Sequence, residues 1–149
     1  MGEVSLRPYR ADDLEPAVDL WRRAWDAAMP EIDFSARLAW WRKRWTDELA
    51  PNNEVIVAEA AGKQVGFVVI DKRSGYLDQI VVDPVFWGSE AAKQLLNAAK
   101  RICPGGITLE VNQDNPRARR FYEREGFVWI GDGKNPISGK PTCRCAWKP

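Results

Sequence analysis

A short stretch near the C-terminus, residues 115–127, predicts one helix with a defined start and a defined end. Asn115 is a strong N-cap residue, and Pro116 suits the first helical position, where a missing N–H costs nothing. Gly126 suits the position just after a helix, because glycine readily adopts the left-handed conformation that ends one. The helix should therefore begin at Pro116 and end near Glu125.

The inner face of this predicted helix carries a tyrosine. Ala118, Phe121 and Tyr122 lie three and four positions apart, which places them on one side of a helix. Phe127 can fold back on the last turn as the apolar partner of the glycine cap. The other side carries the charged residues Arg117, Arg119, Arg120, Glu123 and Arg124. Two interpretations of Tyr122 follow: a core residue with a hydrogen-bonded hydroxyl, or a hydroxyl held rigidly at a functional site.

Hydrophobic periodicity and chain-breaking residues predict the other elements. Strands are expected at residues 4–10, 55–60, 64–71, 76–83, 107–111, 127–130 and 142–147. Further helices are expected between Asp13 and Pro30, at 33–49 and at 89–103. The element order is therefore βααβββαβαββ, and the chain has no internal repeat.

Length and charge limit what the chain can be. Its 149 residues, 45% hydrophobic and 29% charged, suit one globular domain spanning residues 1–149. The formal net charge of +1 gives no general attraction to nucleic acids or anionic lipids. No apolar stretch approaches 18 residues, and the N-terminus lacks a signal-peptide pattern. We expect a cytoplasmic protein with no nucleic-acid partner and no membrane partner.

The residues that serve metal and nucleophilic chemistry are scarce. Cys103, Cys143 and Cys145 are too few for a disulfide framework, and they fit a reducing compartment. Two cysteines alternating along a strand, without a second pair, are better explained as packed thiols than as a metal site. The chain contains no histidine, which excludes Ser-His-Asp and Cys-His catalysis. We therefore predict no metal, and proton transfer through carboxylates, tyrosine, a thiol or water.

The predicted C-terminal helix resembles a known motif. Asn115, Ala118, Phe121-Tyr122 and Gly126-Phe127, with a strand on each side, resemble the C-terminal motif of the GNAT superfamily of acyl-CoA-dependent N-acyltransferases. The element order βααβββαβαββ is also the order of that fold. The resemblance implies an α/β (α+β) domain with a mixed central sheet of about seven strands flanked by four helices.

The resemblance also implies acetyl-CoA as the acyl donor. In the family, the end of the fourth strand pairs its backbone with the pantetheine arm, which here implies Ile80, Val81 and Val82. The next loop follows the pattern Gln or Arg, any two residues, Gly, any residue, Gly or Ala, and its N–H groups surround the pyrophosphate at a helix N-terminus. Here the six positions are Trp87, Gly88, Ser89, Glu90, Ala91 and Ala92. Asn115 and Tyr122 complete the implied cofactor contacts.

This loop departs from the family pattern, most severely at Glu90. A carboxylate roughly 5 Å from a phosphate charge costs about 3 kcal/mol at an effective dielectric constant near 20. An alternative needs no ligand, because Ser89 as an N-cap and Glu90 in the first turn make a sound helix start. The pyrophosphate loop is thus degenerate.

If the chain is an enzyme, the resemblance implies direct attack of an amine on the thioester. A backbone N–H of the strand at Ile80 to Val82 would polarise the carbonyl, and Tyr122 would protonate the departing thiolate. Asp78 and Glu110 are both candidate general bases, and each is equally well explained as an ordinary strand or salt-bridge residue. The acceptor is the amine of a small molecule or peptide.

Five tryptophans fall on the first two predicted helices, which form much of the acceptor pocket in the family: Trp21, Trp25, Trp40, Trp41 and Trp45. Trp40 and Trp41 cannot face the same way on a helix, so one should be exposed near the cleft or at a subunit contact, which leaves a homodimer open.

Two alternatives to an acetyltransferase stay open. One is a GNAT-fold protein without catalysis that acts as a CoA-binding or regulatory module. The other is a nucleic-acid-binding module, since Arg22, Arg23, Arg42, Lys43 and Arg44 interleave with the tryptophans. Against the latter, residues 1–50 hold 8 Lys/Arg and 10 Asp/Glu, a net charge of −2.

Overall fold

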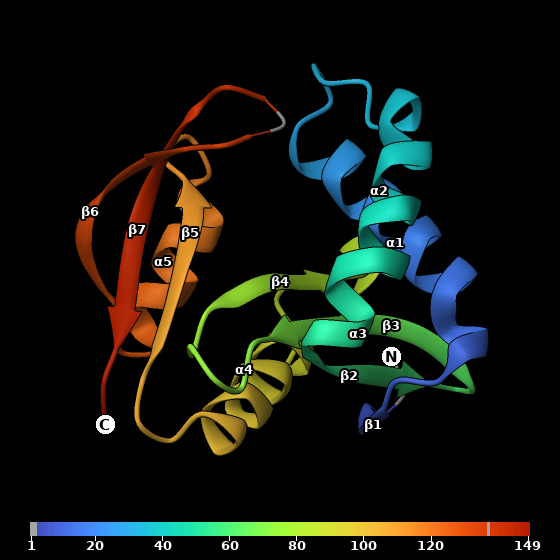
Figure 1. Ribbon diagram of the computed structural model, residues 1–149, viewed down its shortest axis with the longest axis horizontal. Helices are drawn as coiled ribbons and strands as arrows, with labels where there is room; N and C mark the ends of the chain where they lie inside the picture. The colour runs from blue at the N-terminus through green and yellow to red at the C-terminus, as the bar shows by residue number, and fades with distance from the viewer. Residues whose placement is uncertain (1–2, 137) are drawn as a thin grey trace.

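The computed structural model describes residues 3–136 and 138–149, and its elements follow the predicted order (Figure 1). The strands are β1 (Ser5–Pro8), β2 (Glu54–Ala60), β3 (Lys63–Ile70), β4 (Leu77–Val82), β5 (Ile107–Asn112), β6 (Val128–Lys134) and β7 (Pro141–Trp147). The helices are α1 (Leu14–Ala28), α2 (Leu38–Arg44), α3 (Ala50–Asn52), α4 (Ala91–Ile102) and α5 (Pro116–Arg124). A π-helical turn, Trp45–Leu49, joins α2 to α3, so the second predicted helix runs on to Asn52. Within the described ranges, no helix is both long and apolar enough to cross a membrane.

The seven strands form two antiparallel sheets that meet at one point. The orders are β1-β2-β3-β4 and β5-β7-β6, and a single parallel bridge joins Tyr76 to Thr108. At this junction the backbones are very close, since a Cβ atom on Gly75 would lie 2.6 Å from the carbonyl oxygen of Gly106. Beyond it β4 and β5 diverge, as Figure 1 shows. The strand number and the mixed pairing are confirmed, and the structure divides the seven strands between two sheets.

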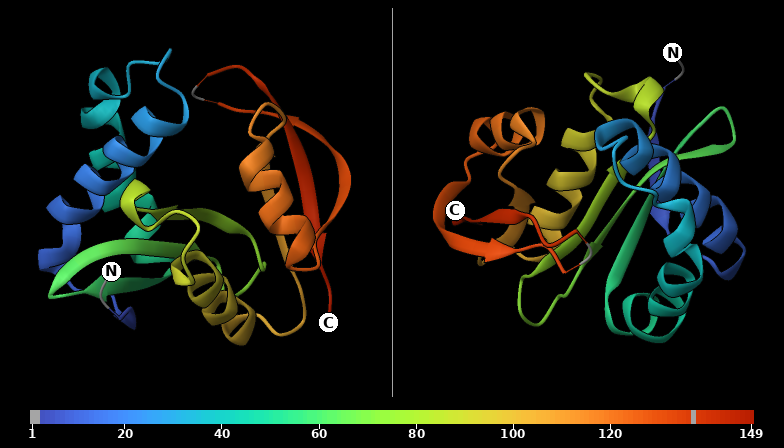
Figure 2. Two further views of the ribbon diagram at one scale, coloured as in Figure 1. Left: turned by 180° about the vertical axis from the view of Figure 1, so that it is seen from behind. Right: turned by 90° about the horizontal axis from the view of Figure 1, so that it is seen from above.

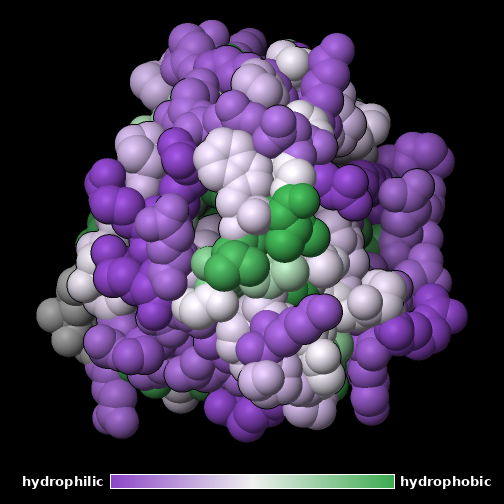
Figure 3. All heavy atoms as spheres, turned by 90° about the vertical axis from the view of Figure 1, so that its left-hand side faces the viewer, coloured by the Kyte–Doolittle hydropathy of each residue, from purple (hydrophilic) through white to green (hydrophobic). Residues whose placement is uncertain are grey.

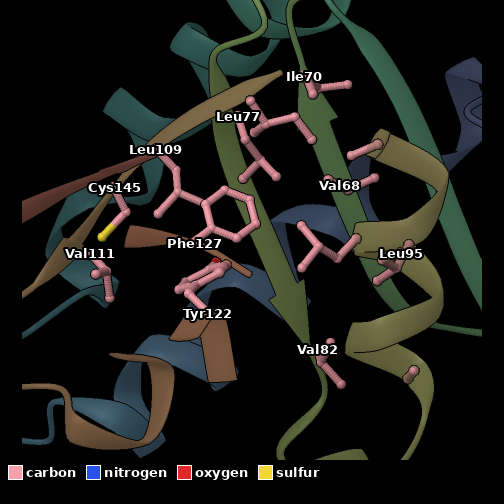
Figure 4. Packing of buried hydrophobic residues seen from close by; sticks show 14 of the residues in the cluster. Val68, Ile70, Leu77, Val82, Leu95, Leu109, Val111, Tyr122, Phe127 and Cys145 are labelled. Carbon is pink, nitrogen blue, oxygen red and sulfur yellow. The ribbon is translucent and has the colours of Figure 1, made fainter. Parts of the chain in front are cut away.

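Two apolar cores hold the sheets and helices together. The first core contains buried side chains of α4, of α5 and of strands from both sheets. In it, Phe127 lies between Leu77 of β4 and Leu109 of β5 (Figure 4). In the second, α1 and α2 pack on the other side of β2, β3 and β4 (Figure 2). On β5, exposed Thr108 and Glu110 alternate with buried Ile107, Leu109 and Val111, so the face of β5 that carries Glu110 is not covered by the first core.

The tryptophans build the second core. The Trp21 and Trp41 rings are stacked, with centroids 4.5 Å apart and planes 10° apart. Trp41 has no exposed surface, whereas Trp40 is 46% exposed. This confirms that two adjacent tryptophans on one helix face opposite ways.

The α5 helix has the predicted caps. The Asn115 side chain accepts a hydrogen bond from the Ala118 N–H at 3.3 Å. At the other end, Gly126 has φ +96° and its N–H donates to the Glu123 carbonyl, while the Phe127 N–H donates to the Tyr122 carbonyl. The Tyr122 and Phe127 rings are in contact, so both bonds and the apolar contact of a Schellman end are present.

The β6 strand is longer than predicted and forms the free edge of its sheet. Its exposed apolar side chains are Val128, Trp129 and Ile130. Figure 3 shows apolar side chains gathered on this side of the molecule. The three cysteines, by contrast, are free and buried in the first core.

We predict that Gly126→Ala lowers the free energy of unfolding by about 1–2 kcal/mol, because an L-residue is strained in the left-handed region. Its Cβ atom would also lie 3.2 Å from the Trp147 side chain. The matched control is Gly105→Ala, which has open space around it and an ordinary φ, and should change stability by less than about 0.5 kcal/mol. Urea unfolding measures both, and equal effects would contradict the prediction.

Candidate active site

A cleft of about 730 Å³ opens where β4 and β5 diverge, within the size range of ligand pockets. Its walls come from α1, β4, the loop before α4, β5 and α5, with the β6–β7 loop at one end. Every residue that the sequence singles out for catalysis or cofactor binding lines this cleft except Ala91. The Ala91 side chain is buried in the first core, and its N–H donates to the Ser89 hydroxyl oxygen.

The edge of β4 presents free backbone groups to this cleft. The Asp83 N–H donates to the Val65 carbonyl at 2.8 Å, which fixes the alternation of the β3–β4 ladder. By that alternation Val81 points its N–H and C=O to β3, while Ile80 and Val82 point theirs to the open edge. The Trp87 indole N–H donates to the Val82 carbonyl at 2.9 Å. The N–H and C=O of Ile80 and the N–H of Val82 are therefore the backbone groups available to a ligand.

The loop before α4 combines an open backbone with a partly ordered helix start. Gly88 has φ +83°, and a Cβ atom there would meet nothing within 4 Å. The Ser89 hydroxyl donates to the Phe86 carbonyl at 2.6 Å. Glu90 is exposed in the position before α4, and the helix begins at Ala91 rather than at Ser89. The Ala91 N–H is paired with the Ser89 hydroxyl oxygen, and the other N–H groups of the first turn of α4, which have no partner within the helix, make this end suited to an anion.

Tyr122 lies at the inner wall of the cleft. It is only 7% exposed, and Figure 4 shows its ring beside that of Phe127. Burial, with a smaller contribution from Cys145, raises the pKa of Tyr122 above its ordinary value near 10. The hydroxyl therefore keeps its proton at neutral pH and can act as a donor.

The two candidate carboxylates differ in their partners. Both oxygens of Asp78 accept hydrogen bonds from Arg44 of α2, at 2.7 and 3.1 Å. Glu110 accepts a hydrogen bond from the Thr142 hydroxyl at 2.7 Å, and no ion pair involves it among the residues that the structure describes. A bidentate arginine occupies the oxygens of Asp78, whereas Glu110 keeps one oxygen for a further proton.

Gly133 makes room for the Glu110 carboxylate. A Cβ atom on Gly133 would collide with the Glu110 Oε1 atom and lie 2.8 Å from the Thr142 hydroxyl oxygen. Tyr76 lies on the other side, and burial, Asp78 and Glu110 raise its pKa to about 12. Glu110 thus sits between a neutral phenol and a hydroxyl donor.

The far end of the cleft is bridged by polar contacts. Lys140, after the β6–β7 turn, pairs with Glu31 of the α1–α2 loop at 2.7 Å and with Asp114 at 3.0 Å. Beneath them Asn135 donates to the buried Asn112 side chain at 3.0 Å. These contacts tie the α1–α2 loop to the second sheet.

Several cleft residues were missed by the sequence analysis: Arg44, Tyr76, Arg117 and Thr142. Strand alternation alone could have indicated Tyr76, since it lies two residues from Asp78. Arg44 and Thr142 come from elements far from the motifs, and no local signal marks them. Arg117 lies within the α5 motif itself, but the helical pattern places it only among the charged residues outside the apolar face.

The comparisons with known proteins agree with this geometry. Residues 14–127 match the acetyltransferase (GNAT) family. The peptidyl-lysine N-acetyltransferase YjaB of Salmonella typhimurium (strain LT2) is 27% identical over 139 residues, which cover 93% of this chain and 92% of that protein.

Two solved structures show the same fold. The solution structure of apo-form YjaB from Escherichia coli has a TM-score of 0.78 at 23% identity and covers 97% of each chain. The crystal structure of the PaiA N-acetyltransferase from Thermoplasma acidophilum in complex with coenzyme A has a TM-score of 0.77 at 18% identity and covers 99% of each chain. With the family match spanning 114 of 149 residues, the chain belongs to the GNAT family and is an N-acetyltransferase.

Proposed function

We propose that this protein transfers the acetyl group of acetyl-CoA to a primary amine by direct attack, and that the amine is a lysine side chain of a peptide. The observation that carries the proposal is the convergence in one cleft of a free strand edge, a helix N-terminus, a protonated tyrosine and a carboxylate outside any ion pair. The peptide acceptor follows the relative named as a peptidyl-lysine N-acetyltransferase.

The donor side of the cleft fits coenzyme A. The outward N–H and C=O groups of Ile80 and the N–H of Val82 can pair with the amides of a pantetheine arm, as a further strand would, while the Val82 carbonyl accepts the Trp87 indole N–H. The first turn of α4 and the open backbone at Gly88 suit the diphosphate. Bound acetyl-CoA supplies the thioester, and an N–H at the β4 edge would polarise its carbonyl.

The two proton transfers are assigned to Glu110 and Tyr122. Glu110 would take the proton of the attacking amine, directly or through water, with the Thr142 hydroxyl orienting it. Asp78 is less suited, because protonation would compete with its two hydrogen bonds from Arg44. Tyr122 would donate its proton as negative charge develops on the leaving sulfur.

The nucleic-acid alternative is weakened by ion pairing. Each basic residue that interleaves with the tryptophans contacts a carboxylate: Arg22 with Asp19 and Asp26, Arg23 with Asp83, Arg42 with Glu15, Lys43 with Asp47, and Arg44 with Asp78. Such cations would have to give up these pairs to bind phosphates.

We predict that acetyl-CoA stabilises the protein against heat. A ligand at 100 times its dissociation constant adds about 2.7 kcal/mol, which corresponds to a rise in Tm of about 5–10 °C for a chain of this size. A thermal-shift assay with acetyl-CoA, and ADP as a control, tests this. No shift at millimolar acetyl-CoA would contradict the donor, and a shift without turnover on any amine would favour the non-catalytic module.

Tyr122→Phe should lower kcat at least tenfold while leaving the Kd for acetyl-CoA nearly unchanged, since only the proton donor is removed. Calorimetry gives the affinity, and thiol release from acetyl-CoA gives the rate. An unchanged kcat would make Tyr122 a packing residue only.

Glu110→Gln should lower kcat about 100-fold at neutral pH, because the amide cannot accept the proton of the amine. The matched control is Asp78→Asn on the facing strand, which should reduce stability by about 1–3 kcal/mol by leaving Arg44 without its carboxylate. If Asp78→Asn lost the larger part of kcat with its fold intact, the roles of the two carboxylates would be reversed.

A further inference from the structure

Arg117 of α5 reaches across the cleft to Trp87, which belongs to the loop before α4 (residues 83–90), here called the donor loop. The guanidinium carbon of Arg117 is 3.8 Å from the centroid of the Trp87 ring, a close stacking contact. The two residues come from different walls of the cleft, and both line it. The indole N–H of Trp87 is fixed in turn by the Val82 carbonyl at the end of β4.

Arg117 carries a positive charge that no carboxylate neutralises. No ion pair within 4.0 Å involves Arg117 in the described part of the chain, unlike Arg44 in the same cleft. Arg117 is exposed as a residue, yet the partial burial of its guanidinium lowers the pKa of this group from its ordinary value. A partly desolvated cation without a counter-ion is a binding group for an anion.

The loop before α4 lacks the basic or amide side chain that would bind the diphosphate in the family pattern. Position 87, basic or an amide in the family pattern, is a tryptophan here, and Glu90 adds a negative charge at the start of α4. The α4 and α5 residues that line the cleft, with the positions just before α4 and just after α5 included, carry three cations and two carboxylates. The cations are Lys93, Arg117 and Arg124, and the carboxylates are Glu90 and Glu125. Arg117 is the one stacked against the loop.

We propose that Arg117 binds the diphosphate of the donor from the α5 side, and that Trp87 is the positioning residue that holds its guanidinium there. This inference rests on the proposed acetyl-CoA donor. It assigns the phosphate-binding charge of the site to a helix on the opposite wall rather than to the loop. The planar guanidinium suits a diphosphate, because it can donate two parallel hydrogen bonds while its face stays on the ring.

Binding of coenzyme A and of pantetheine, which lacks the phosphates, tests this role. Arg117→Ala should weaken coenzyme A about 10- to 100-fold by calorimetry, and the loss should shrink at high salt. Pantetheine, measured by NMR titration, should bind both proteins alike. The matched control is Arg120→Ala, since Arg120 is an exposed arginine of the same helix that does not line the cleft, and its Kd should stay within about twofold.

Substitutions that keep or remove the aromatic ring test the positioning role of Trp87. Trp87→Phe keeps an aromatic face and should retain most of the affinity for coenzyme A, whereas Trp87→Leu should lose part of it. In the Arg117→Ala background the two Trp87 variants should bind coenzyme A equally, since no guanidinium remains to be positioned. Circular dichroism confirms that each variant is folded.

The outcomes separate this inference from the function it rests on. Wild-type protein that binds neither coenzyme A nor acetyl-CoA overturns the proposed donor, and the inference with it. Wild-type protein that binds coenzyme A while Arg117→Ala binds it equally well overturns the inference alone. An equal loss for coenzyme A and pantetheine in Arg117→Ala also overturns it, because the contact would then serve only to shape the cleft.

Discussion

The divergence of β4 and β5 after a single bridge is the constraint on which the site depends. The bridge between Tyr76 and Thr108 holds the two sheets together, and Phe127 fills the space between them. Because β4 pairs only with β3 beyond that point, its outer N–H and C=O groups stay available in the middle of the protein. An internal strand edge is ordinarily paired or covered, so its retention here indicates a place kept for a ligand that completes it.

The parts of the fold that sequence reasoning predicted are those encoded by neighbouring residues. The start and end of α5 depend on Asn115, Pro116 and Gly126 alone, and the structure has all three in their expected roles. The split of the sheet depends on the approach of Gly75 to Gly106 and on the placing of Phe127. Such contacts join segments that no short-range pattern connects, so the sequence predicts the seven strands but not where they divide into two sheets.

The same distinction applies to the site. Asp78 and Glu110 were equivalent as acidic residues on strands, since their partners lie 34 and 32 residues away in Arg44 and Thr142. The pairing with Arg44 is what separates an acid held in an ion pair from one whose oxygen remains free to accept a proton. Ala91 differs from its neighbours for a related reason. The motif assigns six consecutive positions to the ligand, whereas the start of α4 turns the Ala91 side chain into the core.

The departure of the donor loop from its family is best judged in three dimensions. Taken alone, tryptophan at position 87 removes the basic or amide group of the family pattern. Glutamate at position 90 adds a carboxylate, whose repulsion of a phosphate charge costs about 3 kcal/mol. In the structure the partly desolvated guanidinium of Arg117, 30 residues further along the chain, lies on that same tryptophan. The aromatic face of Trp87 stacks with the Arg117 guanidinium, which an amide or a lysine at position 87 could not do. The two residues are therefore best explained together, as one binding unit. In the proposed arrangement the positive charge that binds the diphosphate comes from Arg117 on the opposite wall rather than from position 87. Glu90 is exposed, and its repulsion of the diphosphate is then offset by the attraction of Arg117.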